Sequence, residues 1–417
     1  MTENFQKHEI TVIGAGIVGI SCALYLQRDG HQVTVIDNLE PGQGCSSGNG
    51  GQIMTDWSAP MGMPGIINQV PGWLFNPLGP LKISWRYLPK IAPWLIRLVA
   101  SSSRRRVESI AKALYSLHRN PMEDMQALIN LGGAQKLVHS SGRIDVYRNQ
   151  KSFAKVAPKL ELLSRHGMLI KKITQEEIRK LEPELEGCFE VGVFFPETFW
   201  TSNPLSLVQK FAEAFLNGDG TILKERVKEF VFNNQKISHV VTDNGKYPTE
   251  LVVLAAGAYS RDLAEKLGSR IPLDTERGYH VKLPHAGVNL SRPVIFPDHY
   301  FGMTPMEDGL RLGGVVEFAG IKAPPNYRHV RRLIRSARLV FPKLDTKGAV
   351  PWMGCRPSIP DSMPVIGASP TQLSAFFAFG HGHHGLGGSA RTGKLLSDLV
   401  AGRHPVIDPY PFRPNRF

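Results

Sequence analysis

The sequence has few cysteines, and they form no pattern that is typical of a metal site or a disulfide framework. Cys22, Cys45, Cys188 and Cys355 are scattered over 417 residues without a C-x-x-C pair. We therefore expect neither a zinc module nor a disulfide scaffold, and a reducing compartment is the default. Runs of about 18 apolar residues, as in a membrane-spanning helix, are also missing. The polar N-terminus lacks the features of a signal peptide, so we predict a cytoplasmic protein.

Acidic residues are outnumbered by basic ones. The chain contains 36 Asp and Glu against 49 Lys and Arg, which gives a formal net charge of +13. A basic surface favours anionic partners but does not choose among lipids, phosphates, acidic substrates and nucleic acid. The sequence contains no recognisable nucleic-acid-binding module, so we expect no nucleic-acid partner. The length predicts two or three domains, and 42% hydrophobic residues exclude a disordered chain.

The first forty residues carry the strand, glycine, helix and strand pattern of a dinucleotide-binding unit. An apolar strand leads into Gly14, Gly16 and Gly19, and a helix follows. These glycines allow a tight turn, close approach of a pyrophosphate and close packing of the helix on the sheet. The helix N-terminus offers unpaired N–H groups to the phosphates. A second strand ends at Asp37, whose carboxylate can accept ribose hydroxyls and argues against NADP.

A later apolar strand, within 250–260, ends in small residues at 255–257 and follows a probable hairpin at 227–232 and 236–242. Flavoproteins that bind a dinucleotide return a strand of this kind to the side of the first one. Small residues are needed at its end because side chains would collide with the cofactor. The alternative is a buried strand that simply ends in a glycine turn.

Five further segments carry a family resemblance. They are 45–53 (CSSGNGGQI), 276–280 (ERGYH), 352–361 (WMGCRPSIPD), 364–367 (PVIG) and 379–388 (FGHGHHGLGG). Together they resemble the D-amino-acid oxidase superfamily of FAD enzymes. Within it the chain is most similar to bacterial D-amino-acid dehydrogenases, including the D-hydroxyproline dehydrogenase type, and the resemblance covers nearly the whole chain.

The resemblance implies an α/β protein with a discontinuous, Rossmann-like FAD-binding domain and a mixed-sheet α+β substrate domain. The expected FAD-binding domain comprises 1–60, 205–270 and 350–417. The expected substrate domain comprises 61–204 and 271–349. FAD is expected to be held non-covalently, although some sarcosine-oxidising relatives attach flavin through a cysteine, which would fall at Gly354 here, next to Cys355.

The helix that we expect after 385–388 would place its N-terminus near the negative charge of a reduced flavin. His381, His383 and His384 could suggest a metal site, but no carboxylate or thiol accompanies them in the sequence and the glycines fit a cofactor loop, so we expect no metal. The expected FAD contacts are Gly14, Gly16, Ile17, Val18, Gly19, Asp37, Ser46, Ser47, Asn49, Gly50, Gly51, Gln52, Ile53, Val227, Ala256, Gly257, His381, Gly382, Gly385, Leu386 and Gly387.

Arg356 is the residue that we expect to bind the substrate. In the superfamily the matching arginine pairs with the substrate carboxylate, and a planar guanidinium can do so through two parallel hydrogen bonds. The alternative is a buried structural ion pair. Arg277, Tyr279 and Tyr300 are candidates for closing the substrate pocket, and His383 is a candidate for contact with flavin or substrate.

The implied reaction is the FAD-dependent oxidative deamination of a D-amino acid. Hydride would pass from Cα of the oriented neutral amine to flavin N5, and the imine would hydrolyse to a 2-oxo acid and ammonia. D-Proline or D-hydroxyproline would give a cyclic imine instead. Electrons would then pass to a quinone or another acceptor. The alternatives are a sarcosine, glycine or L-proline-type amine oxidase of the same superfamily, and a flavin-binding assembly protein without turnover.

Residues 57–106 form an aromatic and basic insertion. It contains Trp57, Trp73, Trp85 and Trp94 and closes on three arginines at 104–106. Tryptophan beside arginine suits a membrane interface. One interpretation is therefore that 73–106 makes peripheral contact with the inner face of the cell membrane and delivers electrons to a quinone. The other is a lid packed over the substrate domain.

Overall fold

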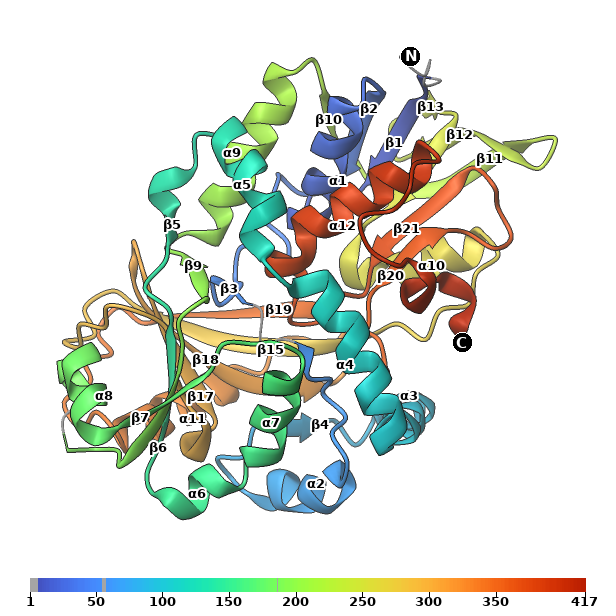
Figure 1. The fold of residues 1–417 in the computed structure, drawn as a ribbon. Coiled ribbons are helices and arrows are strands. Elements are labelled where there is room, and N and C mark those ends of the chain that lie inside the picture. The colour runs from blue at the N-terminus through green and yellow to red at the C-terminus, as the bar shows by residue number, and fades with distance from the viewer. Residues whose placement is uncertain (1–6, 55–57, 186) are drawn as a thin grey trace.

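The protein is built around two large β-sheets, which lie in different parts of the molecule (Figure 1). The computed structural model describes residues 7–54, 58–185 and 187–417. A six-stranded sheet occupies the part that contains both chain ends, and a nine-stranded sheet occupies the other part (Figure 1). This arrangement confirms the expected α/β class with a Rossmann-like sheet and a second, mixed sheet.

The six-stranded sheet is parallel except for one edge strand. Its spatial order is β10 (Thr221–Lys224), β2 (Gln32–Asp37), β1 (Glu9–Ile13), β14 (Leu251–Leu254), β21 (Ala375–Phe379) and the antiparallel β20 (Val365–Ala368). As the sequence predicts, β14 pairs in parallel with β1, with Val253 opposite Val12. All three chain segments that we expected in the FAD-binding domain contribute strands to this sheet.

The strands of this sheet are apolar on both sides because both faces are covered. Helices α1 (Ile17–Arg28), α5 (Pro121–Leu131), α9 (Pro204–Asn217) and α12 (Gly385–Val400) pack on one face. On the other face lie α10 (Ser260–Lys266) and the three-stranded sheet of β11 (Val227–Asn233), β12 (Lys236–Thr242) and β13 (Lys246–Pro248). Continuous apolar runs such as residues 10–13 are typical of parallel strands buried in this way. The antiparallel pair of β11 and β12 confirms the predicted hairpin.

The nine-stranded sheet is mixed. Its order is β19 (Val350–Ser358), β15 (Asp274–Leu283), β18 (Gly309–Phe318), β17 (Phe301–Met306), β16 (Val294–Phe296), β6 (Arg143–Tyr147), β8 (Val191–Phe195) and β7 (Lys171–Thr174), with β4 (Leu81–Ile83) pairing with β18. Helix α11 (Arg328–Arg338) packs on it through Val330 and Leu333. The edge strand β19 was assigned by sequence to the FAD-binding part at 350–417, but it pairs here with β15.

Short elements connect the two sheets. Strand β3 (Gln52–Ile53) pairs with β9 (Phe199–Thr201), which also pairs with β5 (Val138–His139). The remaining helices are α4 (Arg104–His118), α6 (Gln150–Ala154), α7 (Ala157–Arg165) and α8 (Gln175–Leu181). The predicted capping box of α8 is present, because Thr174 Oγ1 accepts the N–H of Glu177 and the Glu177 carboxylate accepts the N–H of Thr174.

The aromatic insertion divides into a packed part and an exposed part. In α3 (Leu88–Ser101), Ile91, Trp94 and Leu98 are buried against Phe318 of β18. In α2 (Ile66–Phe75), only Ile66 is buried. Trp57 lies outside the described residues. Among the described residues, no helix combines the length and the apolar character that a membrane crossing requires.

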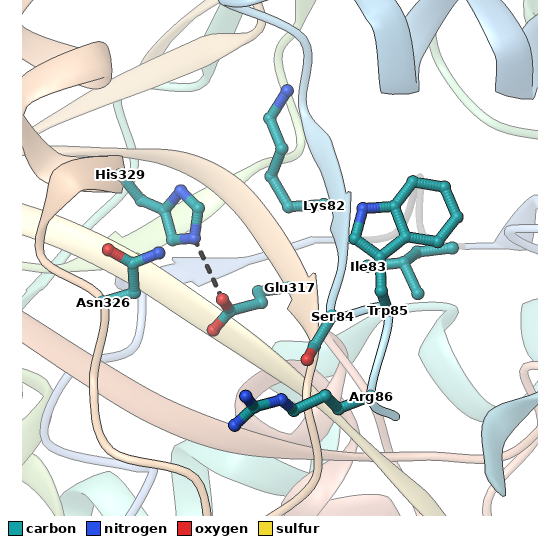
Figure 2. Close-up of a pocket in the computed structure, with 8 residues that line it drawn as sticks. All are labelled: Lys82, Ile83, Ser84, Trp85, Arg86, Glu317, Asn326 and His329. Atoms are coloured by element: carbon teal, nitrogen blue, oxygen red, sulfur yellow. Dashed lines mark hydrogen bonds and ion pairs between the residues drawn. The ribbon is translucent and has the colours of Figure 1, made fainter. Parts of the chain in front are cut away.

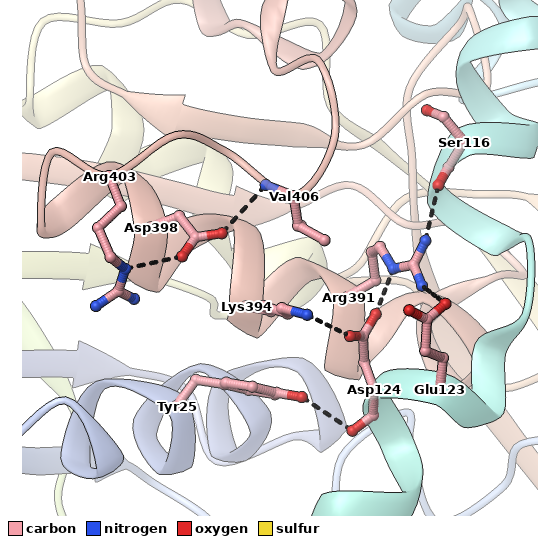
Figure 3. A network of polar contacts seen from close by, with 9 residues as sticks. All are labelled: Tyr25, Ser116, Glu123, Asp124, Arg391, Lys394, Asp398, Arg403 and Val406. Atoms are coloured by element: carbon pink, nitrogen blue, oxygen red, sulfur yellow. Dashed lines mark hydrogen bonds and ion pairs between the residues drawn. The ribbon is translucent and has the colours of Figure 1, made fainter.

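A buried ion-pair network fixes α12 against α4 and α5 (Figure 3). The guanidinium of Arg391 donates to the carboxylates of Asp124 and Glu123 and to the carbonyl of Ser116. Lys394 donates to Asp124 over 3.2 Å, and Arg391 and Asp124 are both almost fully buried. Breaking such a pair on one side is costly because it leaves an uncompensated buried charge. The network therefore holds the direction of α12, whose first turn lies at the site described next.

Candidate active site

The turn between β1 and α1 has no room for side chains at two of its glycines. Gly14 has a φ of +114°, and a Cβ there would lie 2.5 Å from the carbonyl oxygen of Ala255. A Cβ on Gly19 would lie 1.8 Å from the carbonyl oxygen of Gly14. The close approach of β14 to this turn follows from its pairing with β1. These two glycines are therefore required by the packing of the chain itself.

Gly16 is different, because the protein does not require a glycine there. Its backbone is extended, with φ −73° and ψ 177°, which any residue can adopt. A Cβ would meet only the hydroxyl of Ser46, at 3.3 Å. Gly16 is the N-cap of α1, whose first turn contains no acidic residue. The position thus leaves open space before a helix N-terminus, which is where a pyrophosphate binds in dinucleotide-binding proteins.

Asp37 lies beside this turn, at the end of β2. Its carboxylate oxygens accept the backbone N–H groups of Ala15, at 2.7 Å, and Leu39, at 2.9 Å. An ionised carboxylate has about four acceptor positions, so acceptor capacity is left for ribose hydroxyls. Val227, at the start of β11, packs on the same side of the sheet as Leu223 of the neighbouring β10. The adenosine contacts that we expected are thus compatible with the geometry.

The segment 45–53 connects this turn to the second sheet. The hydroxyl of Ser46 accepts the N–H of Ile17 at 3.0 Å, so one end of the segment is attached to the first turn of α1. Ser47 donates to the carbonyl of Gly44, and Asn49 accepts the N–H of Gly51 through its side chain. These local bonds give the segment a defined shape.

Two side chains of the nine-stranded sheet hold the middle of this segment. Arg311 of β18 donates to the carbonyls of Ser47 and Asn49, and Nδ1 of His280 lies 3.2 Å from the carbonyl of Gly48. Burial and then the charge of Arg311 lower the pKa of His280 to about 3, so this imidazole is neutral. Within the described residues, the buried Oε1 of Gln52 has no hydrogen-bond partner, and it is therefore available to a cofactor.

The first turn of α12 is glycine-rich. We expected 385–388 to precede this helix, but α12 begins at Gly385, and its N-cap His384 makes no side-chain capping bond. No acidic residue lies in the first turn. A Cβ on Gly387 would approach the backbone nitrogen of Met54 at 3.4 Å. The first turn of this second helix therefore carries no carboxylate of its own, which suits a delocalised flavin anion. Leu386 itself is buried in the core beneath it.

His381 and Gly382 lie in the loop that precedes this helix. Nε2 of His381 lies 3.0 Å from the hydroxyl of Thr392, and burial, followed by the charge of His118, lowers the pKa of His381 to about 3. Its side chain is thus neutral and bonded to α12. Gly382 has a φ of +54° and donates its N–H to the carbonyl of Pro357 at 2.7 Å. A direct flavin contact by either residue stays a prediction.

Arg356 lies on β19 against a glycine of β15. Gly278 has no side chain, and a Cβ there would lie 2.2 Å from Cζ of Arg356. The guanidinium therefore occupies the space above the backbone of β15. Its NH1 atom is buried and has no hydrogen-bond partner among the described residues. Among the described residues, no carboxylate lies within ion-pair distance of Arg356. The buried structural ion pair that we considered as the alternative is therefore not formed with any of them.

Glu276 of β15 is opposite Arg356 in the strand pairing. It is fully buried, and its Oε2 lies 2.8 Å from Nε2 of His383. Its Oε1 is buried and has no hydrogen-bond partner in the described structure. Burial alone would raise the pKa of Glu276, but His383, Ser358 and Arg356 outweigh it and lower the pKa. The carboxylate is therefore ionised, and one oxygen is free to accept.

Trp352 completes this face. Its ring stacks on His280 at 4.6 Å between centroids and 12° between planes. Trp352 also covers two glycines, since a Cβ on Gly48 or Gly354 would lie within about 2.3 Å of its ring. Sequence reasoning missed Glu276, His280 and Trp352 as site residues. The available signal was the alternation in ERGYH, which places Glu276, Gly278 and His280 on one side of a strand.

Arg277 and Tyr279 do not belong to this face, which corrects the expectation that they close the substrate pocket with Arg356. Successive side chains of a strand point to opposite faces. Arg277 and Tyr279 therefore point away from Arg356, and both are 1% exposed. The Tyr279 hydroxyl donates to Glu317 at 2.6 Å, and Arg277 forms an ion pair with Glu317 at 3.3 Å.

Three other expected residues have less defined places. Tyr300 has a φ of +57°, and its carbonyl oxygen lies against Gly314, but no described contact joins it to Arg356. Ala256 and Gly257 follow β14 beside the Gly14 turn, where the Gly257 φ is +55°. Their proposed roles stay predictions. No group of three or more histidine, cysteine or acidic side chains suited to a metal was found among the described residues.

Comparison with known proteins also indicates an FAD-dependent oxidoreductase. The profile of the DAO family, described as FAD dependent oxidoreductase, matches residues 9–399. The chain is 35% identical to a D-amino-acid oxidase of Bradyrhizobium diazoefficiens, over 99% of both chains, and 32% identical to a D-amino acid dehydrogenase of Paramagnetospirillum magneticum, over 96% of both.

Solved structures share the fold at lower identity. The L-proline dehydrogenase of P. horikoshii superimposes with a TM-score of 0.76 at 20% identity, covering 99% of this chain and 98% of that one. The glycine oxidase of Geobacillus kaustophilus gives a TM-score of 0.74 at 19% identity, covering 99% of both. The residues around Gly16, Asp37, Gln52 and α12 fit FAD on the observations above.

We predict that Gly16→Val keeps the fold but loses FAD. The backbone at Gly16 accepts any residue, whereas a valine side chain would fill the space before the α1 N-terminus. The flavin absorbance per purified protein should fall at least tenfold, while the far-ultraviolet circular dichroism stays unchanged. Gly44→Ala, in exposed space within the adjoining loop, is the matched control and should keep its flavin. Full flavin content in Gly16→Val would contradict the assignment.

Proposed function

Since the chain belongs to the DAO family of FAD dependent oxidoreductases, we propose that it oxidises the amine-bearing carbon of a D-amino acid. FAD is the cofactor, and when bound it supplies an acceptor for two electrons in the form of a hydride. The observation that carries the proposal is an unclosed pair of opposite charges in the described structure, Arg356 and Glu276, on the strand face that His383, just before α12, also contacts. The residues of the protein would bind the substrate, orient it and accept its proton.

The pair is complementary to the zwitterion of an amino acid. Within the described part of the chain, a buried donor of Arg356 and a buried acceptor of Glu276 have no hydrogen-bond partner. Buried polar atoms in native proteins are nearly always hydrogen-bonded, so unsatisfied atoms of opposite charge at one place require an explanation. A substrate carboxylate on Arg356 and a substrate ammonium group toward Glu276 would satisfy both. Binding at two points would also fix the orientation of Cα.

Glu276 and His383 form a proton acceptor for the substrate ammonium group. Oxidation requires the neutral amine, so one proton must leave the zwitterion first. The ionised carboxylate of Glu276 is bonded to His383, whose side chain is about one-quarter exposed. A proton accepted at this pair can therefore leave through His383 toward solvent. Water then converts the resulting imine to a 2-oxo acid and ammonia.

The D configuration rests on the names of the full-length relatives. The D-amino-acid oxidase and D-amino acid dehydrogenase described above cover at least 96% of this chain at 32–35% identity. The L-proline dehydrogenase and the glycine oxidase are similar in fold only. An oxidase of sarcosine, glycine or L-proline is the alternative, and a panel of D-, L- and N-alkyl amino acids separates the two. D-Proline and D-hydroxyproline belong in that panel. A flavin that no substrate bleaches anaerobically would indicate an assembly protein.

The exposed part of the insertion favours peripheral contact with an anionic membrane. Helix α2 contains no charged residue, and its Ile67 and Phe75 are 59% and 85% exposed. The stretch 57–107 contains no acidic residue and has seven cations, at positions 82, 86, 90, 97 and 104–106. Apolar side chains surrounded by cations suit the interface of an anionic bilayer. This contact would bring the enzyme to a quinone as electron acceptor, while α3 acts as packed cover over the second sheet.

Arg356→Ala should lower kcat/KM for the preferred D-amino acid at least about a hundredfold. The lost interaction is a charge-assisted, two-pronged hydrogen bond, and each tenfold corresponds to about 1.4 kcal/mol. Arg356→Lys keeps the charge without the fork and should fall between the two. Initial rates with an artificial acceptor and anaerobic flavin bleaching provide the measurement. The exposed Arg97, replaced by alanine, is the control. Unchanged turnover in Arg356→Ala would refute the role.

Glu276→Gln should slow the reaction at neutral pH by about two to three orders of magnitude, the usual contribution of a positioned proton acceptor. The rate should recover as the pH rises toward the pKa of the substrate's own ammonium group, since solvent then supplies the neutral amine. The pH profile of kcat/KM tests this point. Glu265→Gln, on α10, is the control. A defect that stays constant at all pH values would indicate a purely structural role.

Ile67→Ser combined with Phe75→Ser should weaken binding to anionic vesicles about tenfold or more, because each exposed apolar side chain contributes on the order of 1.5–3 kcal/mol when buried. Flotation at low salt with phosphatidylglycerol vesicles measures it. Leu373→Ser removes an equally exposed apolar side chain, at 83%, from another part of the molecule and should have no effect. Absence of wild-type flotation removes the membrane contact from the proposal.

A further inference from the structure

A second polar pocket lies on the face of the nine-stranded sheet opposite to Arg356. It has a volume of about 420 Å³, and Figure 2 shows the side chains around it. The lining residues come from three chain segments and are Lys82, Ile83, Ser84, Trp85, Arg86, Glu317, Asn326 and His329. Glu317 belongs to β18 and faces Arg277 and Tyr279, the two residues that point away from the active site.

The carboxylate at the base of this pocket already has three side-chain partners. One oxygen of Glu317 accepts the Tyr279 hydroxyl at 2.6 Å and pairs with buried Arg277 at 3.3 Å. The other oxygen lies 3.1 Å from Nε2 of His329 (Figure 2). The Tyr279 hydroxyl in turn accepts the N–H of Asn326. Glu317 therefore has its charge balanced by Arg277 and is not available to neutralise another cation.

Both ring nitrogens of His329 have a partner. Nε2 lies 3.1 Å from Glu317, and Nδ1 lies 3.2 Å from the guanidinium of Arg332. Arg332 is thereby held beside the pocket, and among the described residues no carboxylate lies within ion-pair distance of it.

Lys82 and Arg86 add two further cations at the rim. Lys82 donates to the carbonyl of Asn76 at 2.8 Å, which leaves two of its N–H groups. Burial, and then the charge of Arg332, lower the pKa of Lys82, so these two cations lie within electrostatic reach of each other. In residues 7–54, 58–185 and 187–417, none of Lys82, Arg86 and Arg332 has an ion-pair partner. Two of these cations thus line the cavity and Arg332 lies beside it, and the one carboxylate among the lining residues is paired with Arg277.

We propose that this pocket binds a phosphate group, held by Lys82 and Arg86 at the rim with Arg332 behind His329. Like charges brought together at a cavity repel one another unless an anion lies between them. A phosphate carries up to two negative charges and several acceptor oxygens, which suits an arginine fork and an ammonium group on opposite sides. The Ser84 hydroxyl and the Asn326 amide are neutral donors on the same wall.

The pocket does not serve the oxidised amino acid. Arg277 and Tyr279 separate it from the Arg356 face, because they alternate along β15 with Glu276 and Gly278. Glu317 already pairs with Arg277 and bonds to Tyr279 and His329, so the lining residues offer an ammonium group no unpaired carboxylate. The proposal is therefore independent of the proposed oxidation, and the two can fail separately.

The phosphate can belong to a small molecule or to a lipid headgroup. Trp85, one wall of the pocket, is 81% exposed, and α2, with its exposed apolar side chains, packs on β4, which carries Lys82. A headgroup could thus enter while α2 contacts the bilayer. A free phosphate ester would use the same nitrogen atoms without α2. The chemistry of the bound group is common to both sources, and vesicles and free phosphate distinguish them.

The test uses the full-length, FAD-loaded enzyme with two probes. Orthophosphate is titrated calorimetrically at low ionic strength, and vesicles of phosphatidylcholine with or without phosphatidylglycerol are used for cosedimentation. The pocket variants are Lys82→Gln and Arg86→Gln. The matched controls remove the same charge from exposed positions outside both the pocket and the stretch 57–107, Lys343→Gln and, on α11, Arg331→Gln. Flavin content verifies the fold of each variant.

We expect each pocket variant to weaken binding about tenfold or more, the range for hydrogen bonds to a charged group, while each control changes it less than about threefold. Orthophosphate binding with this pattern supports a small phosphate ligand. Binding only to phosphatidylglycerol vesicles, with the same pattern, supports a headgroup. The proposal is overturned if neither probe binds the wild type, or if controls and pocket variants lose binding equally. Turnover without phosphate should be equal in all variants.

Discussion

The guanidinium of Arg356 lies directly over the backbone of Gly278, and the site depends on this contact. A side chain at 278 would lie 2.2 Å from Cζ of Arg356, so the arginine can occupy its place only over a glycine. The contact in turn depends on the register of β15 and β19, in which Glu276 is opposite Arg356. A slip of one residue would turn every side chain of β15 to the other face of the sheet. The substrate face and the phosphate pocket would then exchange residues.

The elements that sequence reasoning predicted are the local ones. The strand, glycine turn, helix and acid between residues 9 and 37 form as predicted, because each part is fixed by its neighbours in sequence. Gly14 and Gly19 are explained by the packing of the chain, whereas the extended backbone of Gly16 does not itself require a glycine. The late strand β14 beside β1 could be predicted from its small residues and from the family resemblance, although the partners are more than 200 residues apart.

Two predictions from the sequence were wrong. One concerns which face of β15 carries Arg277 and Tyr279, and the other concerns the residue at which α12 begins. The motif ERGYH marks the right segment, but the sequence does not state which alternate residues face the cofactor, and Arg277 and Tyr279 were assigned to the wrong side. Glu276 was missed because the sequence does not state which strand pairs with β15, and it is the pairing with β19 that places Glu276 opposite Arg356. The α12 glycines were placed before the helix, since glycine usually favours a loop, whereas the helix begins at Gly385 and packs closely there, with a Cβ on Gly388 lying 2.9 Å from the His118 ring.

Glu276 and Arg277 are consecutive residues of opposite charge, and each is opposite a residue of the other sign on a neighbouring strand. Arg277 meets Glu317 of β18, and that pair closes at 3.3 Å with Tyr279 and His329 bonded around it. Glu276 meets Arg356 of β19, and that pair stays open, with one buried atom of each residue unsatisfied in the described structure. Closing a buried pair recovers part of the cost of desolvating two charges, so an open pair lowers stability unless a ligand completes it. The closed pair is therefore structural, and the open pair is where we propose that the zwitterion binds, because a molecule that carries both charges satisfies both atoms at once.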